Sequence, residues 1–305
     1  MSLVSPALAF PRTPGMNPSV AAWIESIVGE PIRLDSVQRV TGGCIHDSRL
    51  VETESGRLVF VKQNALDQHV LFETEKQSLE LLANAKAIRV PQPYATAVLD
   101  EAAVFAMEGI RLRNRQDSRS QEQMGRDLAR LHSIHSSDGR FGAGFDNFIG
   151  ATPQPNGWME CWADFFVERR LDHQFRLAAA LGQRFSDARK LLSATHEYLR
   201  DLEILPSLLH GDLWGGNASF DESGNPVLFD PATYFGDQET DIAFTRLFGG
   251  FGPDFYASYR ETVPEPEPVR HEIYNLYHLL NHFVLFRGGY AQQADASIRS
   301  ILGAI

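Results

Sequence analysis

The first third of the chain combines short runs of apolar residues with turn residues, a pattern typical of antiparallel strands. We expect strands at residues 32–40, 48–53, 58–62, 94–99 and 102–107. A helix at 21–28, ended by Gly29, precedes them. A second helix follows the third strand, because the apolar residues from Val70 to Leu82 repeat with a helical period before Pro91.

Helical periods dominate from about residue 118 onward. They predict helices at residues 121–132, 158–181, 185–202, 270–286 and 294–302. One pair of short strands, 208–209 and 227–229, interrupts them. The sequence therefore predicts an α+β, bilobal protein. Its predicted parts are a loosely ordered leader (1–16), a lobe with a small antiparallel sheet and one helix (17–107), a hinge (108–112) and a larger, mainly helical lobe (113–305).

The composition is that of a globular protein and excludes a mainly disordered chain, since 43% of the 305 residues are hydrophobic and 22% are charged. The net charge of −11 argues against nucleic acid and anionic membranes as partners. No apolar run is long enough to span a membrane, and the first residues lack the basic start of a secretory signal. Cys44 and Cys161 are too few for a disulfide framework, so we expect a cytoplasmic protein.

The segment 210–217, His-Gly-Asp-Leu-Trp-Gly-Gly-Asn, is the strongest candidate for chemistry. Asp212 follows a short apolar strand, Asn217 lies five residues later on a glycine-rich turn, and Asp230 ends the next strand. Two neighbouring strand ends would thus bring two carboxylates and an amide together. Oxygen ligands of this kind suit Mg²⁺ with substrate phosphates, and the remaining aspartate would accept a proton from a substrate hydroxyl. The spacing matches the protein-kinase catalytic loop, with Gly211 in place of arginine.

A simpler interpretation is that Asp212 and Asn217 only cap turns. The second carboxylate, Asp230, at the end of the following strand favours the functional interpretation. We expect His210 to be a buried residue that hydrogen-bonds to the loop backbone, rather than a proton-transfer group.

Groups suited to nucleotide phosphates occur upstream in a matching order. Gly42 and Gly43 form a turn between two strands, Lys62 ends a strand, and the following helix bears two glutamates. In kinases a Lys–Glu ion pair of this kind positions the ammonium that contacts the phosphates. We prefer Glu75 to Glu73 as the partner of Lys62, because Glu75 lies one turn before a leucine of the buried stripe. A solvent-exposed position remains open for either glutamate.

Two features near these groups have alternative interpretations. Met107, Glu108 and Ile110 form either an ordinary linker or the segment whose backbone pairs with adenine, as in a bilobal kinase. Cys44, inside the glycine turn, is either a small apolar loop residue or a thiol whose oxidation would block ATP.

Two further residues have alternatives on the acceptor side. Trp214 either stacks on a face of a sugar substrate or packs the catalytic loop onto the helical lobe. Asp237 either attracts a cationic amine of the substrate or caps the helix that begins at Ile242, and for Asp241 we favour capping.

The sequence resembles the fructosamine kinases, or ketosamine-3-kinases, a family within the aminoglycoside and choline kinase group, which has a protein-kinase-like fold. The resemblance spans nearly the whole chain beyond the leader. The matching segments are TGGCI (41–45), FVK (60–62), FETE (72–75), FGAGFDNFIGATPQPNGW (141–158), WADFFVERRL (162–171), HGDLWGGNA (210–218), FDPATYFGDQETDIAFTRLFGGF (229–251) and YNLYHLLNHF (274–283). The Trp-Gly-Gly insert before Asn217 is the discriminating part, because related kinases usually lack it.

The resemblance implies ATP-dependent phosphorylation of the 3-hydroxyl of a ketosamine, a small-molecule or protein-linked adduct of a sugar and an amine. The unstable product then sheds the sugar, so the family is regarded as deglycating. The implied roles are general base (Asp212), magnesium ligands (Asn217, Asp230), phosphate-binding lysine and its partner (Lys62, Glu75) and phosphate-covering turn (Gly42, Gly43).

Three rival functions remain from the sequence: an aminoglycoside, choline or other small-molecule sugar kinase of the same fold, a nucleotide-binding pseudokinase, and a metal-dependent hydrolase that uses Asp212 and Asp230. A pseudokinase requires the loss of a catalytic group, and a hydrolase leaves Lys62 unexplained. The chain lacks the glycine-rich, D-F-G and A-P-E motifs of protein kinases, and Pro231 stiffens the turn after Asp230. A protein kinase with a mobile activation loop is therefore disfavoured.

Overall fold

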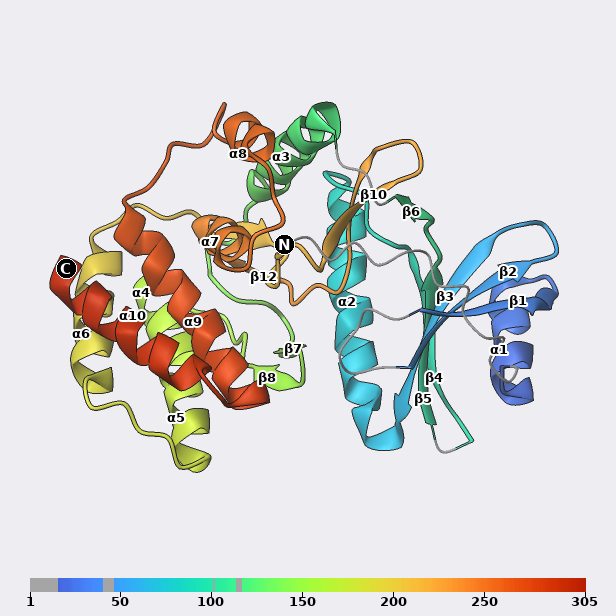
Figure 1. Ribbon diagram of the computed structural model, residues 1–305, viewed down its shortest axis with the longest axis horizontal. Helices are drawn as coiled ribbons and strands as arrows, with labels where there is room; N and C mark the ends of the chain where they lie inside the picture. Colours follow the sequence, from blue (N-terminus) through green and yellow to red (C-terminus); the bar gives the residue numbers. More distant parts are fainter. Residues whose placement is uncertain (1–15, 41–46, 101, 114–116) are drawn as a thin grey trace. The chain divides into compact units, whose positions relative to one another are not determined.

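A computed structural model describes residues 16–40, 47–100, 102–113 and 117–305 (Figure 1). They form two compact units, one made of the described residues up to 69 with 93–110, the other of 70–92 with 111–305. The predicted α+β class is confirmed, because the first unit is built on an antiparallel sheet and the second mainly on helices. The predicted leader up to residue 15 and the turn at Gly42, Gly43 and Cys44 lie outside the described residues.

The first unit is a five-stranded antiparallel sheet in the order β1–β2–β3–β5–β4, with helix α1 packed on it (Figure 1). Its elements are α1 (Pro18–Val28), β1 (Ile32–Val40), β2 (Asp47–Thr53), β3 (Leu58–Ala65), the 3-10 turn η1 (Leu66–Gln68), β4 (Pro93–Leu99) and β5 (Ala102–Glu108). Helix α1 begins earlier than the pattern predicts, because Asn17 caps it by accepting a hydrogen bond from the Ser19 amide.

Strand alternation sets the position of Lys62 in this sheet. Val59 and Val61 point into the core beneath α1, so Lys62 points to the opposite face. Lys62 is only 5% exposed and lies opposite Ser48 on β2 and Phe105 on β5. A lysine buried in this way needs polar or anionic partners, as the phosphate-binding prediction requires.

The second unit holds the other helices and three small sheets. Its helices are α2 (His69–Ala85), α3 (Ser118–His132), α4 (Trp162–Phe165), the π-helix η2 (Phe166–Asp172), α5 (His173–Ala180), α6 (Ala188–Arg200), α7 (Glu239–Leu247), α8 (Pro253–Tyr259), α9 (Pro268–Phe286) and α10 (Tyr290–Ala304). The sequence pattern placed α2 with the sheet lobe, whereas its residues from Val70 onward group with the helical unit. The core lies where the aromatic and aliphatic side chains of α4, α5, α6, α9 and α10 meet.

The predicted helix over 158–181 is three consecutive segments with a π-helix in the middle. Within that segment Arg170 is completely buried, and its guanidinium lies 4.1 Å from the centre of the Tyr234 ring and 4.7 Å from that of Phe165. It donates hydrogen bonds of 2.7 Å to the Pro155 carbonyl and to Asn156 Oδ1. Aromatic faces and oxygen acceptors therefore replace water around this cation.

The two predicted strands near the catalytic motif both form, but they do not pair with each other. The short strands of this unit are β6 (Leu112–Arg113), β7 (Asn147–Ile149), β8 (Thr152–Gln154), β9 (Ser207–Leu209), β10 (Ala218–Asp221), β11 (Pro226–Leu228) and β12 (Tyr234–Gly236). Strand β9 pairs with β12, while β11 pairs with β10, which in turn pairs with β6. The predicted pairing was wrong because strands of three residues carry no alternation that fixes a partner.

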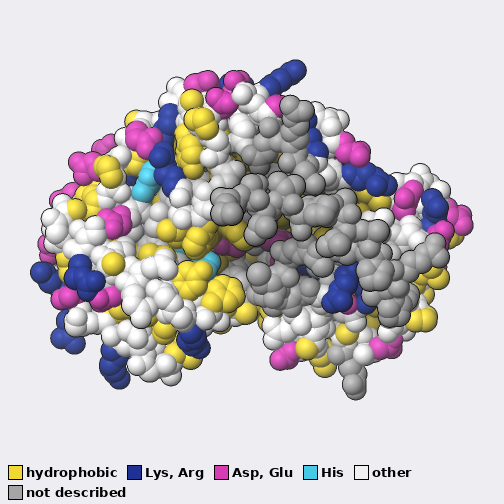
Figure 2. Space-filling view, in the orientation of Figure 1, with side chains coloured by type: hydrophobic (Ala, Val, Ile, Leu, Met, Phe, Trp, Pro, Cys, Tyr) yellow, Lys and Arg dark blue, Asp and Glu magenta, His cyan; other side chains and the backbone are white. Residues whose placement is uncertain are grey.

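On the coloured part of the face in view, Lys and Arg side chains are interspersed with Asp and Glu side chains (Figure 2). Across the described ranges, no helix combines the length and the apolar character needed to cross a membrane.

Candidate functional site

The loop after β9 turns sharply at Gly211, and only glycine fits there. Gly211 has a φ of +84°, and a Cβ at this position would lie 2.0 Å from the Ala232 carbonyl oxygen. The His210 carbonyl accepts a hydrogen bond of 2.9 Å from the Ala232 amide, which holds the two backbones together. The departure from the kinase pattern, glycine instead of arginine, thus has a steric cause.

The side chains of Asp212 and Asn217 meet as the spacing predicts. Asn217 Nδ2 donates to Asp212 Oδ2 and to the Asp212 carbonyl, both at 2.9 Å, and lies 3.5 Å from the Asp230 carbonyl. The Phe229 amide donates to the Asn217 carbonyl at 3.1 Å. The ends of β9 and β11 therefore converge, although these strands belong to different sheets.

His210 is a structural residue, as predicted. Its ring is fully buried, its Nε2 donates to the Phe229 carbonyl at 3.0 Å, and its Nδ1 accepts from the Asp212 amide at 3.3 Å. Burial lowers the pKa of His210, so the ring is neutral at physiological pH. One imidazole thus fixes the backbone of Asp212 to the strand that ends at Asp230.

Asp241, in the first turn of α7, holds the loop that bears Asp212 rather than capping the helix. Its carboxylate accepts hydrogen bonds from the amides of His210 (2.7 Å) and Gly211 (2.9 Å), and His132 Nε2 lies 3.2 Å away. Burial alone would raise the pKa of Asp241, but the hydrogen bond and charge of His132 and the backbone donors hold it below its ordinary value. The predicted capping role was wrong because α7 begins at Glu239, two residues before Asp241.

The electrostatics of Asp212 suit a proton acceptor. Burial raises its pKa to about 7; the Asn217 hydrogen bond opposes this shift, and the charges of Asp230 and Asp241 add to it. A carboxylic acid that titrates near neutral pH can take a proton from a hydroxyl and release it again.

The oxygen donors of this cluster fit a hard divalent cation. Asn217 directs its Nδ2 at Asp212, and among the described residues no hydrogen bond uses its Oδ1, which is left as an acceptor. Mutually repelling carboxylates would also be stabilised by a cation. Within the ranges described, no group of three His, Cys, Asp or Glu side chains could hold a metal alone, so substrate oxygens would have to complete the coordination.

Asp230 lies in a strained backbone conformation. Its φ is +56°, which is uncommon for a residue other than glycine, and Pro231 follows it. Strain of this kind persists only where the surrounding structure fixes the backbone, and here the bonds from Phe229 and Ala232 on either side do so. The expectation of a stiff turn at Pro231 is consistent with this geometry.

Trp214 follows the predicted base by two residues and is 37% exposed. Its indole packs over Gly216, where a Cβ would lie 2.3 Å from the ring, and its edge meets Phe248 at a centroid distance of 6.3 Å. The packing role is therefore present, and the exposed remainder of the ring leaves the sugar-stacking role as a prediction.

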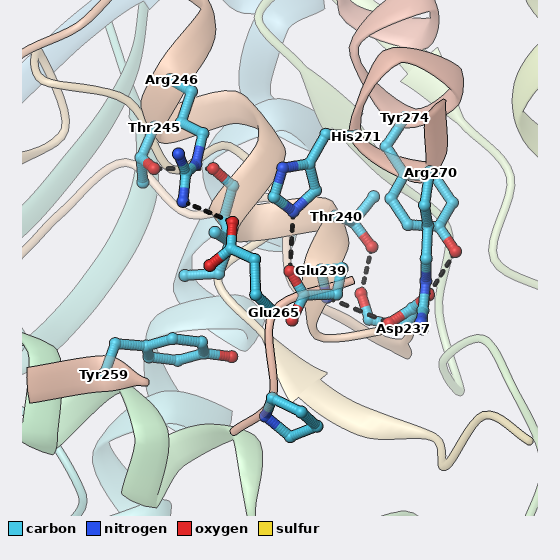
Figure 3. A network of polar contacts seen from close by, with 12 residues as sticks. Asp237, Glu239, Thr240, Thr245, Arg246, Tyr259, Glu265, Arg270, His271 and Tyr274 are labelled. Atoms are coloured by element: carbon cyan, nitrogen blue, oxygen red, sulfur yellow. Dashed lines mark hydrogen bonds and ion pairs between the residues drawn. The ribbon is translucent and has the colours of Figure 1, made fainter. Parts of the chain in front are cut away.

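Asp237 takes the structural alternative of the two we considered (Figure 3). It is 1% exposed, its Oδ1 accepts from the Glu239 amide at 3.0 Å, and it forms an ion pair with Arg270, whose Nε lies 2.8 Å from Oδ2. The Tyr274 hydroxyl also donates to it. A carboxylate already neutralised and buried in this way caps α7, and the geometry does not favour its attraction of a substrate amine.

Glu239 joins the same end of α7 to Arg260 and His271, and Figure 3 shows its contact with His271. Arg260 reaches both carboxylate oxygens, at 2.6 and 2.7 Å, and His271 Nε2 lies 2.7 Å from Oε2. Burial alone would raise the pKa of Glu239, but Arg260 and His271 lower it to about 2. No sequence pattern predicts this network, because its members are scattered from 237 to 274.

The remaining predicted residues lie as follows. Lys62 is on β3 of the first unit, and Glu75 and Glu73 are both half-buried on α2 of the second, so the Lys62–Glu75 pair stays a prediction. Met107 is buried in β5, with Glu108 and Ile110 half-buried at and beyond its end. Their backbone contact with adenine also stays a prediction.

Comparisons with known proteins agree with this geometry. The model of the family described as fructosamine kinase matches residues 16–304. The chain is 41% identical to a Synechocystis protein named "probable ketoamine kinase", over 95% of this chain and 98% of that protein. It is 37% identical to the chloroplastic protein-ribulosamine 3-kinase of Oryza sativa subsp. indica, over 93% of this chain and 83% of the rice protein.

Solved structures confirm the predicted kinase-like fold. A candidate fructosamine-3-kinase from Haemophilus somnus 129PT superposes with a TM-score of 0.84 at 28% identity, over 93% of this chain and 97% of that one. A choline kinase of Streptococcus pneumoniae shares the fold alone, with a TM-score of 0.59 at 16% identity, over 94% and 98% of the two chains.

We expect Asp241→Asn to lower kcat at least about tenfold, because the loss of the anion loosens the backbone that presents Asp212. The free energy of unfolding should fall by about 2–3 kcal/mol, since two buried amides lose a charged acceptor. Steady-state kinetics and urea unfolding at pH 7 measure both effects, with the exposed Asp201→Asn as the matched control. Unchanged kcat in a folded Asp241→Asn protein would contradict the positioning role.

Glu239→Gln should destabilise the protein in a pH-dependent way. The folded pKa of Glu239, about 2, lies below its ordinary value of 4.5, so its contribution to stability is present above pH 4.5 and is lost as the pH falls through about 2. We expect the substitution to lower the free energy of unfolding by about 3 kcal/mol at pH 7, and by roughly 1 kcal/mol less than that at pH 3.5. Urea unfolding at both pH values measures this change, with the exposed Glu222→Gln as the control. An equal loss of stability at pH 7 and pH 3.5 would contradict the ion-pair explanation.

Proposed function

The chain belongs to the fructosamine kinase family, and from this premise we propose that it transfers the terminal phosphoryl group of ATP to the 3-hydroxyl of ketosamines, free or protein-linked. The observation that carries the proposal is the convergence of Asp212, Asn217 and Asp230 at the ends of two strands held together by His210. The two relatives described above, at 41% and 37% identity, are named for ketoamines and ribulosamines. The choline kinase shares only the fold. The acceptor we propose is therefore a ketosamine rather than choline or an aminoglycoside.

Asp212 would act on the acceptor. Its ionised carboxylate orients the sugar hydroxyl and takes its proton as the new bond between the hydroxyl oxygen and the terminal phosphorus forms. The bond from that phosphorus to the bridging oxygen of ATP breaks at the same time, and ADP leaves with the electron pair. The product is the 3-phosphate of the ketosamine, and Asp212 returns its proton to solvent.

Asn217 Oδ1 and Asp230 would hold Mg²⁺ together with oxygens of the nucleotide. Bound there, the ion supplies positive charge against the phosphates. Lys62, oriented by Glu75, would add a further cation, and the turn at Gly42 and Gly43 would cover the phosphates. In this scheme the protein contributes mainly positioning and electrostatics. The low cysteine content supports action in the cytoplasm.

Asp212→Asn should lower kcat about 10²- to 10⁴-fold, because the amide cannot accept the hydroxyl proton. ATP binding should persist, since Asp212 is not among the proposed phosphate or metal ligands. ATP consumption is measured with a fructosamine, a ribulosamine, an aminoglycoside and choline, and calorimetry measures nucleotide binding. The exposed Asp138→Asn is the control.

Two results would reject this assignment. Near-native turnover by Asp212→Asn would show that another group takes the proton. Phosphorylation of choline or of the aminoglycoside, with neither ketosamine consumed, would replace the proposed acceptor.

A further inference from the structure

Three exposed aromatic side chains stand out on the second unit. Within the described part of the chain, the tryptophan and phenylalanine side chains that count as exposed are Trp214 at 37%, Phe248 at 39% and Phe286 at 53%. They come from the catalytic loop, the end of α7 and the end of α9, which are far apart in the sequence. Figure 2 shows hydrophobic side chains gathered at the surface of this unit among charged ones. Exposed apolar surface that gathers in one place marks a binding surface more often than scattered residues do.

Ring contacts join these three side chains into one continuous surface. Phe248 meets Trp214 at a centroid distance of 6.3 Å and His282 at 4.7 Å. His282 in turn meets Phe286 at 5.6 Å and Tyr290 at 5.1 Å. We call these five residues, Trp214, Phe248, His282, Phe286 and Tyr290, the aromatic band. It starts two residues from the proposed base and runs over the ends of α7 and α9 to the start of α10.

The band rests on a rigid support. Phe248 packs on Phe244 at 5.7 Å, and Phe244 stacks in parallel on His278, with the ring centres 3.5 Å apart. Phe244 and His278 are both buried, at 1% and 2% exposure. Rings held on helices in this way are preorganised, so a ligand bound to them would lose little of its affinity to ordering the protein.

The band carries no formal charge at neutral pH. His282 Nδ1 donates to the His278 carbonyl at 2.8 Å, and burial lowers the pKa of His282, so the ring is neutral. The nearest cation in the sequence, Arg287, donates to the Phe283 carbonyl and lies over the Phe283 ring. Such a surface suits an apolar group, while the face of an indole also attracts a cationic amine.

We propose that the aromatic band binds the amine half of the ketosamine, and that this half is apolar, an aryl or alkyl chain. The inference rests on the proposed function. In a ketosamine the amine is attached at C1, two carbons from the hydroxyl on C3 that receives the phosphoryl group. With that hydroxyl at Asp212, we place the amine beside Trp214, from which ring contacts lead to Phe248 and, through His282, to Phe286.

The test compares two ketosamines that share a sugar and differ in the amine, fructosyl-benzylamine and fructosyl-glycine. We expect the wild-type protein to favour the benzyl compound at least about tenfold in kcat/KM. Phe286→Ala should reduce this preference about fivefold, mainly through KM, and Phe286→Tyr should keep it. In calorimetric titrations without nucleotide, fructosyl-benzylamine should bind the wild-type protein and Phe286→Tyr more tightly than Phe286→Ala.

Phe286 is more than half exposed, so the alanine variant should fold. The control is Leu181→Ala, which removes an exposed apolar side chain elsewhere in the same unit. The binding role of the aromatic band would be rejected if the wild-type protein had equal kcat/KM for the two compounds, or if Phe286→Ala kept the preference. The kinase assignment would stand in either case. A wild-type dimer that Phe286→Ala dissociates without a change in preference would assign the band to self-association instead. Failure of a folded wild-type protein to phosphorylate either compound would reject the proposed function, and the band assignment with it.

Discussion

The geometry of the candidate site depends on one buried carboxylate, Asp241. Two successive backbone amides, those of His210 and Gly211, donate to it, and a buried anion with only partial compensation would be costly. The loop therefore cannot move away from α7 without removing these two backbone donors from the buried charge, which would leave His132 as its remaining described side-chain partner. Asp237 and Glu239 fix the same end of α7 to Arg270 and to Arg260 and His271, so the position of Asp212 follows from a chain of ion pairs that starts outside the site.

The same constraint brings negative charges close together. Asp230 and Asp241 both raise the pKa of Asp212, whereas Asp241 itself stays ionised because His132 and two amides stabilise its anion. Two carboxyls in one small region thus have opposite shifts, a separation often found where one group exchanges protons and the other positions it. The asymmetry comes from the number of donors around each group, since Asn217 is the main donor to the Asp212 side chain.

The sequence predicted the contacts that depend on neighbouring residues. It did not predict the contacts between segments that are far apart in the chain. The spacing of Asp212 and Asn217 and the strand before Asp230 are local, so their meeting could be foreseen. The pairing of β9 with β12 could not, because strands of three residues have no period to read. Nor could the sequence show that Asp241 supports the loop instead of α7, or that Arg170 is buried, because their partners come from elsewhere in the chain.

The segment 210–217 contains both buried and exposed residues. Gly211 and His210 are buried against the Ala232 and Phe229 backbone, so substitutions there act on the position of the base. Trp214 belongs to the same loop, yet its ring is 37% exposed and contacts Phe248 at the end of α7. Under the proposed role of the aromatic band, substitutions at the ends of α7 and α9 would change the acceptor preference while the hydrogen bonds that hold Asp212 stay as they are. Such a separation would let one fold serve kinases of different acceptors, because function depends on the residues of the site rather than on the fold.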